Sequence, residues 1–479
     1  MIEAGQPTEL FIGGDWLPTE RTFPVADPAN GRQLCAVADA GPEHALAALD
    51  AACAAAADWA ATPAARRADI LRTAYEALLG RREEIARLIT LEMGKPIAEA
   101  RGEVDYGAGF FRWFADGAGR LHLDGGYGHE PGGQYRILTA HRPVGPSLLI
   151  TPWNFPLAMG TRKIGAALAA GCTAILKPAE QTPLTALLLA DVLREAGVPG
   201  GVVNVLSTTD AAGVTEPLLA DPRLRKLSFT GSTRVGKLLL EKAARGVLRT
   251  SMELGGNAAL LVFDDADLDT AVEGAMVAKL RNGGESCVAA NRIYVQSGIR
   301  AAFTERFTER MTASVCGHGL EPGTTLGPMI DERQRTKVAD LVADAVRGGA
   351  RVLGEGTVPQ DSEGFFYPAT VLTDIPQDAA LRTEEIFGPV AAIYSFDEET
   401  EALAYANDTP FGLASYVFTG DVSRAMRVAE ALDTGMTGIN RGVVSNPAAP
   451  FGGVKESGLG REGGGQGIEE YLETKYIGL

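Results

Sequence analysis

The sequence predicts an α/β fold with mostly parallel sheets covered by helices on both faces. From residue 146 to 263, short apolar runs alternate with stretches of helical periodicity, which is typical of βαβ units. A second α/β pattern begins after residue 258, so we expect two such domains. A chain of 479 residues with 46% hydrophobic residues is long enough for two or three domains, each with its own core.

The first α/β stretch contains five apolar runs that we interpret as strands. They are Ser147–Ile150, Thr173–Leu176, Val202–Leu206, Lys226–Phe229 and Ala258–Phe263. Helical patterns fill three of the gaps, at Leu157–Ala170, Pro183–Ala196 and Thr233–Ala244. Parallel sheets bind ligands at the carboxyl ends of their strands, so residues that follow these runs are the first candidates for a site.

Helices are also expected upstream of this stretch and further strands downstream. Sequence rich in Ala, Leu, Arg and Glu predicts helices at Glu43–Ala61, Arg66–Met93 and Glu99–Phe114. Further strands are predicted at Arg292–Val295, Ala391–Phe396 and Ser415–Phe418. Two segments, 127–142 and 467–479, fit neither domain. The first has turn glycines and predicts a hairpin, which is marginal alone in water and therefore favours a partner edge.

Composition and charge exclude several classes of protein. A formal charge of −17 argues against nucleic acid or an anionic membrane as the main partner, because both need a basic face. The sequence has no apolar run of about 18 residues and no signal-peptide pattern, so we expect a soluble, cytoplasmic protein. The five cysteines and five histidines lack ligand spacing. We therefore predict neither a disulfide framework nor a metal site.

Two glycine-flanked segments suggest a nucleophile and a base. Cys287 follows Asn-Gly-Gly-Glu-Ser, and Glu253 lies earlier in Met-Glu-Leu-Gly-Gly-Asn. A thiol of ordinary pKa, about 8.5, is mostly protonated at neutral pH, so a catalytic cysteine needs a lowered pKa or a nearby base. Glu253 could be that base. Taken alone, a lone cysteine is more often a small buried hydrophobe.

Both segments resemble the active-site signatures of the aldehyde dehydrogenase superfamily, and further matching segments run from about Trp16 to about Tyr476. The resemblance implies an aldehyde dehydrogenase-like fold. Its parts would be a Rossmann-like NAD-binding domain at 1–122 and 144–255, an α/β catalytic domain at 256–450, and a small β oligomerisation extension at 123–143 and 451–479. The extension pairs between subunits in this family, which implies a homo-oligomer, either a dimer or a tetramer.

Asn154 directly follows the first predicted strand, in Thr-Pro-Trp-Asn-Phe-Pro. Its amide can donate a hydrogen bond to the carbonyl oxygen that becomes negatively charged when a thiolate attacks an aldehyde. The resemblance implies that Asn154 acts in this way together with the backbone N–H of Cys287. The alternative is that Asn154 only caps the following helix.

The cofactor that the resemblance implies is a nicotinamide dinucleotide. Lys177 and Glu180 follow a strand where the adenosine ribose would lie, and a carboxylate there would repel a 2′-phosphate. We therefore expect NAD as the cofactor, although NADP stays open. The alternative for Lys177 and Glu180 is that they form an exposed surface pair without a role in binding. Gly231 and Ser232 open a helix whose free N–H groups suit a pyrophosphate, although they also form an ordinary helix cap. The resemblance adds four cofactor contacts: Trp153, Leu254, Glu385 and Phe387.

Arg162, Arg281 and Ser445 indicate which aldehyde is bound. At the matching positions, the succinate-semialdehyde dehydrogenases of the family use two arginines and a serine to bind the substrate carboxylate. Guanidinium groups bind carboxylates bidentately, which supports a small carboxylated aldehyde as the substrate. Resemblance to this branch implies that succinate semialdehyde is oxidised to succinate through a cysteine thiohemiacetal and a thioester. Alternatively, the two arginines are surface residues with unrelated partners.

Other functions stay open at this level. Glutarate semialdehyde is one methylene longer, and a methylene changes binding by only about 1 to 3 kcal/mol. Another alternative is an aldehyde dehydrogenase with a broader substrate range. From another class of protein, the alternative is a catalytically silent paralogue with a structural or binding role. The chain also departs from the family pattern near the nucleophile, because Glu285 and Ser286 replace a common Gln-Thr. Glu285 could raise the pKa of Cys287 by repulsion. Ala289 stands where some relatives have a second cysteine, so no disulfide switch is expected.

Overall fold

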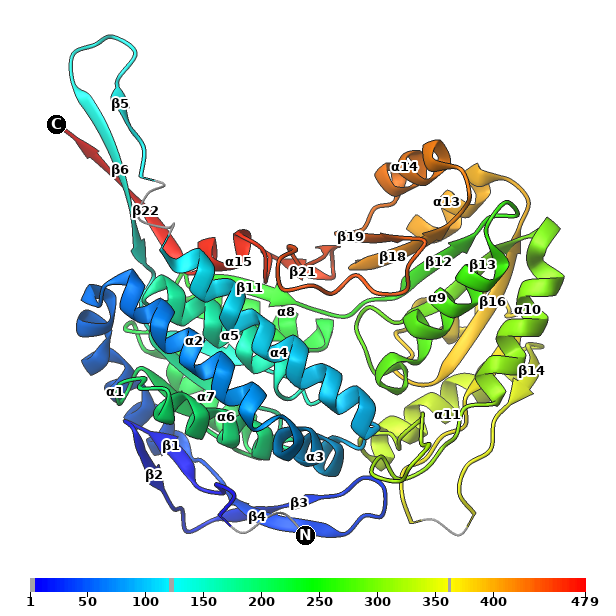
Figure 1. The fold of residues 1–479 in the computed structure, drawn as a ribbon, viewed down its shortest axis with the longest axis horizontal. Helices are drawn as coiled ribbons and strands as arrows, with labels where there is room; N and C mark the ends of the chain where they lie inside the picture. The colour runs from blue at the N-terminus through cyan, green and yellow to red at the C-terminus, as the bar shows by residue number, and fades with distance from the viewer. Residues whose placement is uncertain (1–4, 120–124, 361–362) are drawn as a thin grey trace.

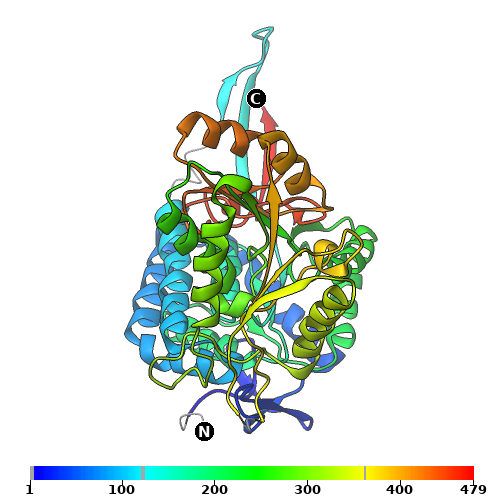
Figure 2. The same cartoon turned by 90° about the vertical axis from the view of Figure 1, so that its right-hand side faces the viewer.

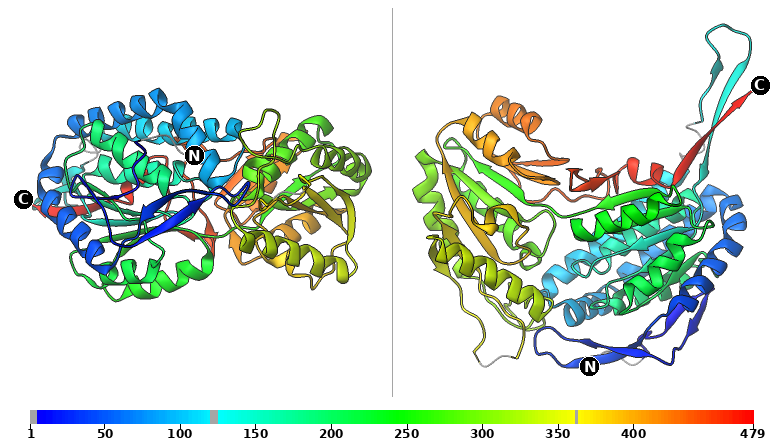
Figure 3. Two further views of the ribbon diagram at one scale, coloured as in Figure 1. Left: turned by 90° about the horizontal axis from the view of Figure 1, so that it is seen from below. Right: turned by 180° about the vertical axis from the view of Figure 1, so that it is seen from behind.

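The computed structural model describes residues 5–119, 125–360 and 363–479, and it has the α/β architecture that the sequence predicts. Two layered domains lie side by side, and a narrow arm projects from the first of them (Figure 1, Figure 3). The fold class expected from the alternation of apolar runs and helical patterns is therefore confirmed.

The first domain is built on a sheet of strand order β2-β1-β9-β8-β7-β10-β11-β21. Its strands are β1 (Leu10–Ile12), β2 (Asp15–Leu17), β7 (Ser147–Ile150), β8 (Ala174–Lys177), β9 (Val203–Val205), β10 (Lys226–Thr230), β11 (Arg249–Glu253) and β21 (Gly458–Leu459). The strands from β9 to β11 are parallel, whereas β1 and β21 pair antiparallel at the two sides. The carboxyl ends of β7, β10 and β11 thus lie next to one another.

Helices cover both faces of this sheet. They are α1 (Pro42–Ala61), α2 (Ala64–Gly80), α3 (Arg82–Met93), α4 (Ile97–Ala118), α5 (Ala158–Ala170), α6 (Pro183–Glu195), α7 (Ala211–Ala220) and α8 (Thr233–Ala244). In β7, Leu149 packs in the core with α2 to α6, whereas Leu148 and Ile150 pack in the core with α1, α7 and α8. Because successive side chains point to opposite faces and both faces are buried, the strand is apolar throughout.

The predicted helix Arg66–Met93 is two helices in the structure. α2 ends at Gly80, and α3 begins at Arg82. Between them Arg81 leaves the helical conformation, with φ −103° and ψ 20°. Its guanidinium group binds Glu84 and Asp191, which joins the break to α6. Helical periodicity continues across this break, so the pattern alone did not show it.

The second domain has a sheet of order β14-β15-β16-β13-β12-β18-β19. Its strands are β12 (Ala258–Val262), β13 (Ala290–Gln296), β14 (Arg351–Glu355), β15 (Thr370–Thr373), β16 (Val390–Phe396), β18 (Ala414–Phe418) and β19 (Met436–Ile439). Its helices are α9 (Leu268–Leu280), α10 (Ser297–Thr312), α11 (Glu332–Arg347), α12 (Ala380–Thr383), α13 (Glu399–Asn407) and α14 (Val422–Ala431). Figure 2 shows α9 and α10 on one side of this sheet and α11 on the other.

The arm consists of β5 (Tyr127–His129), β6 (Arg136–Pro143) and β22 (Leu472–Gly478), in the order β22-β6-β5. The two segments that fit neither domain are thus paired with each other within one chain. The predicted junction at residues 122 and 123 lies outside the described residues.

The C-terminal part of the predicted extension, which starts at residue 451, departs from this arm. β20 (Val454–Lys455) and β21 pair with strands of the body, β17 (Phe411–Gly412) and β11, and α15 (Gln466–Glu469) follows. Within 451–479, only β22 joins the hairpin. A further pair at the N-terminal side, β3 (Thr22–Ala26) with β4 (Gln33–Ala38), was not evident from the sequence.

Candidate active site

A cavity lies at the carboxyl ends of β7, β10 and β11, between the two domains. The predicted site residues that line it are Trp153, Asn154, Arg162, Gly231, Ser232, Leu254, Arg281, Cys287, Glu385, Phe387 and Ser445. The predicted residues that do not line it are Lys177, Glu180 and Glu253. The structure therefore brings residues from separate parts of the chain to one place, as expected for the carboxyl edge of a parallel sheet.

The loop that carries Cys287 has an unusual backbone. After α9, the residues Asn282, Gly283 and Gly284 have positive φ values of 58°, 62° and 76°. Glycine is required at position 284, because a Cβ atom there would lie 2.2 Å from the carbonyl oxygen of Gly388. The chain thus turns sharply just before Cys287 and places this residue at the cavity.

Asn154 contacts the same loop. Its Nδ2 donates a hydrogen bond of 3.0 Å to the carbonyl oxygen of Glu285. An amide nitrogen carries two hydrogens, so one remains for a substrate oxygen. Asn154 does not cap α5: the N-cap position is Leu157, and the Asn154 Oδ1 accepts no hydrogen bond from the described residues. Instead, the buried carboxylate of Glu103 accepts from the backbone N–H of Leu157 and Ala158.

Glu253 is the last residue of β11 and is buried, with 2% of its surface exposed. Among the described residues, neither of its carboxylate oxygens has a hydrogen-bond partner. Burial raises its pKa well above the ordinary value, and the charge of Glu462 adds to the increase, while Arg162 and Lys163 act to lower it. A carboxylate with a raised pKa is a stronger proton acceptor near neutral pH, which is what a general base needs.

Glu462 is a neighbour of the site that the sequence analysis missed. Its Oε2 lies 2.6 Å from Nε of Arg162, and its Oε1 lies 2.5 Å from Nζ of Lys163. All three side chains are buried. Burial acts to raise the pKa of Glu462, but the two cations outweigh it, so the pKa is lowered. The available signal was two adjacent cations within an apolar helix, because such charges need a buried partner.

The thiol of Cys287 is held in its protonated form. Burial raises its pKa to about 12; Arg162 acts to lower it, whereas Glu385 and Glu253 add to the increase. At neutral pH the resting thiol therefore needs a base before it can attack.

The expected influence of Glu285 on this thiol is not found. The Glu285 Oε1 accepts a hydrogen bond of 3.2 Å from the backbone N–H of Ile330. Burial raises the pKa of Glu285 well above the ordinary value, which disfavours its charged form. The charges that raise the pKa of Cys287 are those of Glu385 and Glu253.

On the nicotinamide side of the predicted site, the rings of Trp153 and Phe387 meet edge to face, 5.4 Å apart. Phe387 has a φ of 57°, which is uncommon for an aromatic residue. Two residues of α11 hold this loop: Gln334 donates to the carbonyl of Phe387 at 2.9 Å, and Lys337 donates to that of Glu385 at 2.7 Å. Both also line the cavity, and no sequence pattern singled them out.

The carboxylate of Glu385 is also buried at this end. It accepts a hydrogen bond of 3.3 Å from the N–H of Gly256, and burial raises its pKa to about 7. Ser232 caps α8 by accepting from the N–H of Val235 at 3.4 Å, so the ordinary helix cap is present. Gly231 and Ser232 nevertheless line the cavity, which leaves the start of α8 facing it.

Lys177 and Glu180 lie apart from this cavity. The buried Lys177 donates to the carbonyl of Pro178 at 3.1 Å, and its Nζ lies 3.9 Å from the carboxylate of Glu180. The Glu180 side chain is 45% exposed. The pair is therefore neither wholly buried nor a free surface pair.

Arg281 and Arg162 both line the cavity but differ in their partners. Arg162 is held by Glu462 and stacks on Phe451, with its guanidinium carbon 4.4 Å from the ring centre. Arg281 lies over the ring of Phe155 at 5.0 Å, and no carboxylate of the described residues is within ion-pair distance of it. Arg281 is thus a half-buried cation whose charge is not paired.

Two further findings concern other classes of site. In the described parts of the chain, His, Cys, Asp and Glu do not gather in groups of three or more that could hold a metal ion. Among the helices of the described residues, none has both the length and the apolar character needed to cross a membrane.

A half-buried thiol, an amide donor and a buried carboxylate lie beside a cavity at the edge of a parallel sheet, and comparisons with known proteins agree with this arrangement. The model of the aldehyde dehydrogenase family matches residues 16–477. The chain therefore belongs to the aldehyde dehydrogenase family, whose members are NAD(P)-dependent oxidoreductases.

Among its relatives, the succinate-semialdehyde dehydrogenase of Paenarthrobacter nicotinovorans is 55% identical, over 93% of this chain and 98% of that protein. Two further relatives are each 48% identical, over 98% of this chain and 97% of their own length. They are the succinate-semialdehyde dehydrogenase [NADP(+)] of Escherichia coli and the glutarate-semialdehyde dehydrogenase of Pseudomonas putida. The structure of succinate-semialdehyde dehydrogenase from Burkholderia pseudomallei superimposes with a TM-score of 0.97 at 44% identity, covering 100% of this chain and 99% of that chain.

Proposed function

We propose that this protein oxidises succinate semialdehyde to succinate with NAD, through a thioester on Cys287. The observation that carries the proposal is the guanidinium of Arg281, without an ion-pair partner among the described residues, in the same cavity as the half-buried Cys287. A buried or half-buried cation without a partner is costly, and a carboxylate on the substrate would supply that partner. The names of the relatives support the same substrate class.

The first steps follow from the surroundings of the thiol. Cys287 gives up its proton to a base, and its Sγ bonds to the aldehyde carbon. Negative charge then develops on the aldehyde oxygen, where the free hydrogen of the Asn154 amide and the backbone N–H of Cys287 can stabilise it. Trp153, Glu385 and Phe387 would hold a bound nicotinamide, which would supply the acceptor for the hydride of this carbon. Loss of the hydride leaves the carbon bonded to Sγ of Cys287 as a thioester.

Hydrolysis of the thioester needs a second proton transfer. Glu253 takes a proton from a water molecule, and the oxygen of that water bonds to the thioester carbon. The carbon–sulfur bond breaks, succinate leaves and the thiol of Cys287 is restored. The raised pKa of Glu253, caused by burial and by Glu462, suits it to this role.

The residues present fit a dinucleotide. Within the cavity, Thr230 Oγ1 is buried without a hydrogen-bond partner among the described residues, directly before Gly231 and Ser232 at the start of α8. We assign the pyrophosphate to this helix end and the nicotinamide ribose to Glu385. NAD is preferred because a carboxylate at Glu180 would repel a 2′-phosphate. One relative is named for NADP, so the choice of cofactor needs its own measurement.

We also propose that the protein is a cytoplasmic homo-oligomer, a dimer or a tetramer. Among residues 5–119, 125–360 and 363–479, no strand pairs with the outer edges of β22 and β5, and Tyr127, Tyr476 and Leu479 are exposed on the arm. An exposed strand edge with apolar side chains is a natural place for a second copy of the chain to pair. Sedimentation of the purified protein would measure the number of copies, and a monomer would refute this part.

The proposal is tested by initial rates with succinate semialdehyde, glutarate semialdehyde and butanal, each with NAD and with NADP. Preference for the acidic aldehydes with NAD is the expected result. Faster turnover of glutarate semialdehyde would favour the alternative for which one relative is named. Equal rates with butanal would remove Arg162, Arg281 and Ser445 as ligands of a substrate carboxylate.

A further inference from the structure

Asn282 links the two loops that carry the reacting groups. Its Nδ2 donates to two carbonyl oxygens, that of Asn154 at 2.9 Å and that of Glu285 at 3.0 Å. The Glu285 carbonyl also accepts from Nδ2 of Asn154. One buried amide thus joins the end of β7, in the first domain, to the Cys287 loop before β13, in the second.

The backbone of Asn282 is fixed as well. Its N–H donates to Oε2 of Glu99 at 2.6 Å, and its carbonyl accepts from the N–H of Glu285 at 3.0 Å. Its φ of 58° is in the left-handed region, which asparagine tolerates better than most residues. Only 1% of its surface is exposed. A buried, left-handed residue with all of these bonds has a single available orientation.

The Asn154 loop is held from the other side by a buried ion pair. Lys95 Nζ donates to the Asn154 carbonyl at 2.8 Å and to Glu103 at 2.5 Å, and Glu103 binds the N–H of Leu157 and Ala158. The Asn154 carbonyl therefore accepts from Lys95 and from Asn282. Removing the Asn282 amide leaves Lys95 in place, so the Asn154 loop keeps its anchor to α4. The loop also keeps the bond from Asn154 Nδ2 to the Glu285 carbonyl, and it loses the bond from Asn282 that fixes the Asn154 carbonyl against the Cys287 loop.

We infer that Asn282 is a positioning residue for the oxyanion site. Asn154 and the Cys287 N–H can stabilise one oxygen only if they are held at a fixed separation, and they belong to different domains. The Asn282 amide binds both loops directly and sets that separation. This inference rests on the proposed roles of Cys287 and Asn154.

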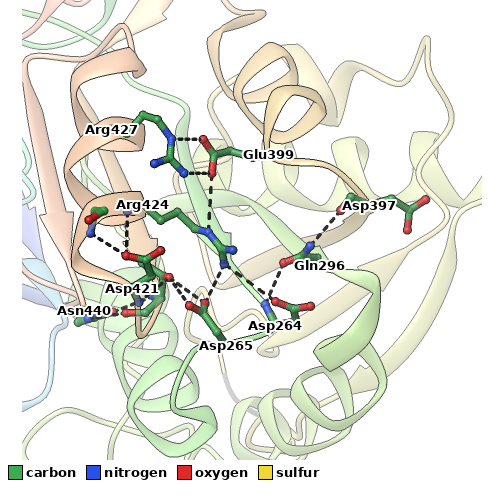
Figure 4. Close-up of polar contacts among 11 residues, drawn as sticks. Asp264, Asp265, Gln296, Asp397, Glu399, Asp421, Arg424, Arg427 and Asn440 are labelled. Carbon is green, nitrogen blue, oxygen red and sulfur yellow. Dashed lines mark hydrogen bonds and ion pairs between the residues drawn. The ribbon is translucent and has the colours of Figure 1, made fainter.

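The chain offers a control for the backbone change in Asn440, which follows β19 and is one of the polar residues drawn in Figure 4. Unlike the buried Asn282, it is exposed. It also has a positive φ, of 51°, and its side chain also binds backbone, donating to the carbonyl of Thr419 at 2.9 Å and accepting from its N–H at 3.0 Å. Asn440 does not line the cavity. Asn440→Gly therefore removes a similar clamp and adds the same backbone freedom without touching the two loops.

In the test, Asn282→Gly keeps the left-handed backbone and removes the amide. We expect kcat with succinate semialdehyde to fall about 100-fold, since a small misplacement of reacting groups has this effect. KM for the aldehyde and for NAD should not change, because the lost interaction acts only in the transition state. Alkylation of Cys287 by iodoacetamide needs no oxyanion site, so its rate should equal that of wild type and of Asn440→Gly.

Wild-type kcat in Asn282→Gly would overturn the inference. A fall in kcat accompanied by equal loss of alkylation and of thermal stability, beyond that of Asn440→Gly, would show a merely structural role and also overturn it. Should the glycine variant not fold, Asn282→Asp serves instead: an ionised carboxylate cannot donate to the two carbonyls, so kcat at pH 7 should be as low as expected for the glycine variant. Undiminished kcat at pH 7 would refute the inference. Turnover by Cys287→Ala would refute the proposed function itself.

Discussion

Replacing Arg281 by methionine removes the unpaired cation of the cavity and keeps much of the apolar stem that lies over Phe155. No carboxylate of the described residues lies within ion-pair distance of Arg281, and the one carboxylate on which its charge acts, Glu99, keeps its bond to the N–H of Asn282. The thermal unfolding midpoint should therefore stay close to that of wild type. What the variant loses is the partner that we propose for the substrate carboxylate.

The size of the loss follows from the strength of such contacts. A hydrogen bond to a charged group contributes about 1.5 to 3 kcal/mol. This corresponds to a fall in kcat/KM for succinate semialdehyde of roughly 10- to 150-fold, at 1.36 kcal/mol for each factor of ten. Butanal carries no carboxylate, so its kcat/KM should be unchanged or rise slightly as the pocket becomes more apolar.

Arg162→Met is the informative comparison. Glu462 would then lose one of its two buried partners, and removing one member of a buried ion pair costs about 3 to 5 kcal/mol of stability. Arg162 also acts to lower the pKa of Cys287, so both aldehydes should be oxidised more slowly. Steady-state rates with both aldehydes and the thermal unfolding midpoint, measured for Arg162→Met and Arg281→Met together, test this difference. An equal loss with succinate semialdehyde and butanal in Arg281→Met would refute the assignment of Arg281.

Three further results are expected. In Glu462→Gln, the charge that raises the pKa of Glu253 is gone, so the rise of thioester hydrolysis with pH should move to lower pH; a shift to higher pH would contradict this cause. Alkylation of wild-type Cys287 should accelerate about tenfold per pH unit from pH 7 to 10, because the thiolate fraction grows below a pKa of about 12. If the alkylation rate instead levelled off above the ordinary thiol pKa of about 8.5, burial would not be raising the pKa of Cys287. Glu180→Ser should raise kcat/KM with NADP relative to NAD, and an unchanged ratio would remove Glu180 as the discriminating residue.

Much of the fold was predictable because the central strands are buried on both faces. The apolar runs at β7, β8, β9, β10 and β12 follow from that burial, and their limits differ from those expected by one residue or so. β11 was not predicted, since Arg-Thr-Ser-Met-Glu is mostly polar, yet it ends in Glu253. Polar residues occur in β11 because they have polar partners: Ser251 bonds to the buried Lys226 and to Glu470 of the C-terminal segment.

The site was predictable only as far as its motifs reach. Local strings selected Cys287, Glu253 and Asn154, and the structure places them around one region. The partners of these residues come from distant parts of the chain: Glu462 is far from Arg162 in sequence, and Gln334 meets the Phe387 loop from another helix. Such contacts depend on how the domains pack and leave no local pattern. The hydrogen bond from the Ile330 N–H to the Glu285 carboxyl group was hidden for the same reason.

The pairing of β21 with β11 has a consequence for how the protein is made. Gly458 approaches β11 so closely that a Cβ atom there would lie 1.9 Å from the carbonyl oxygen of Met252, so the tail seals the strand that ends in Glu253. On the ribosome, the edge of β11 stays open until β21 has been synthesised. Open strand edges recruit other chains, so the nascent protein is exposed to mispairing at β11 until β21 emerges and pairs with it. The synthesis of β21 is thus the step that closes the strand that ends in Glu253.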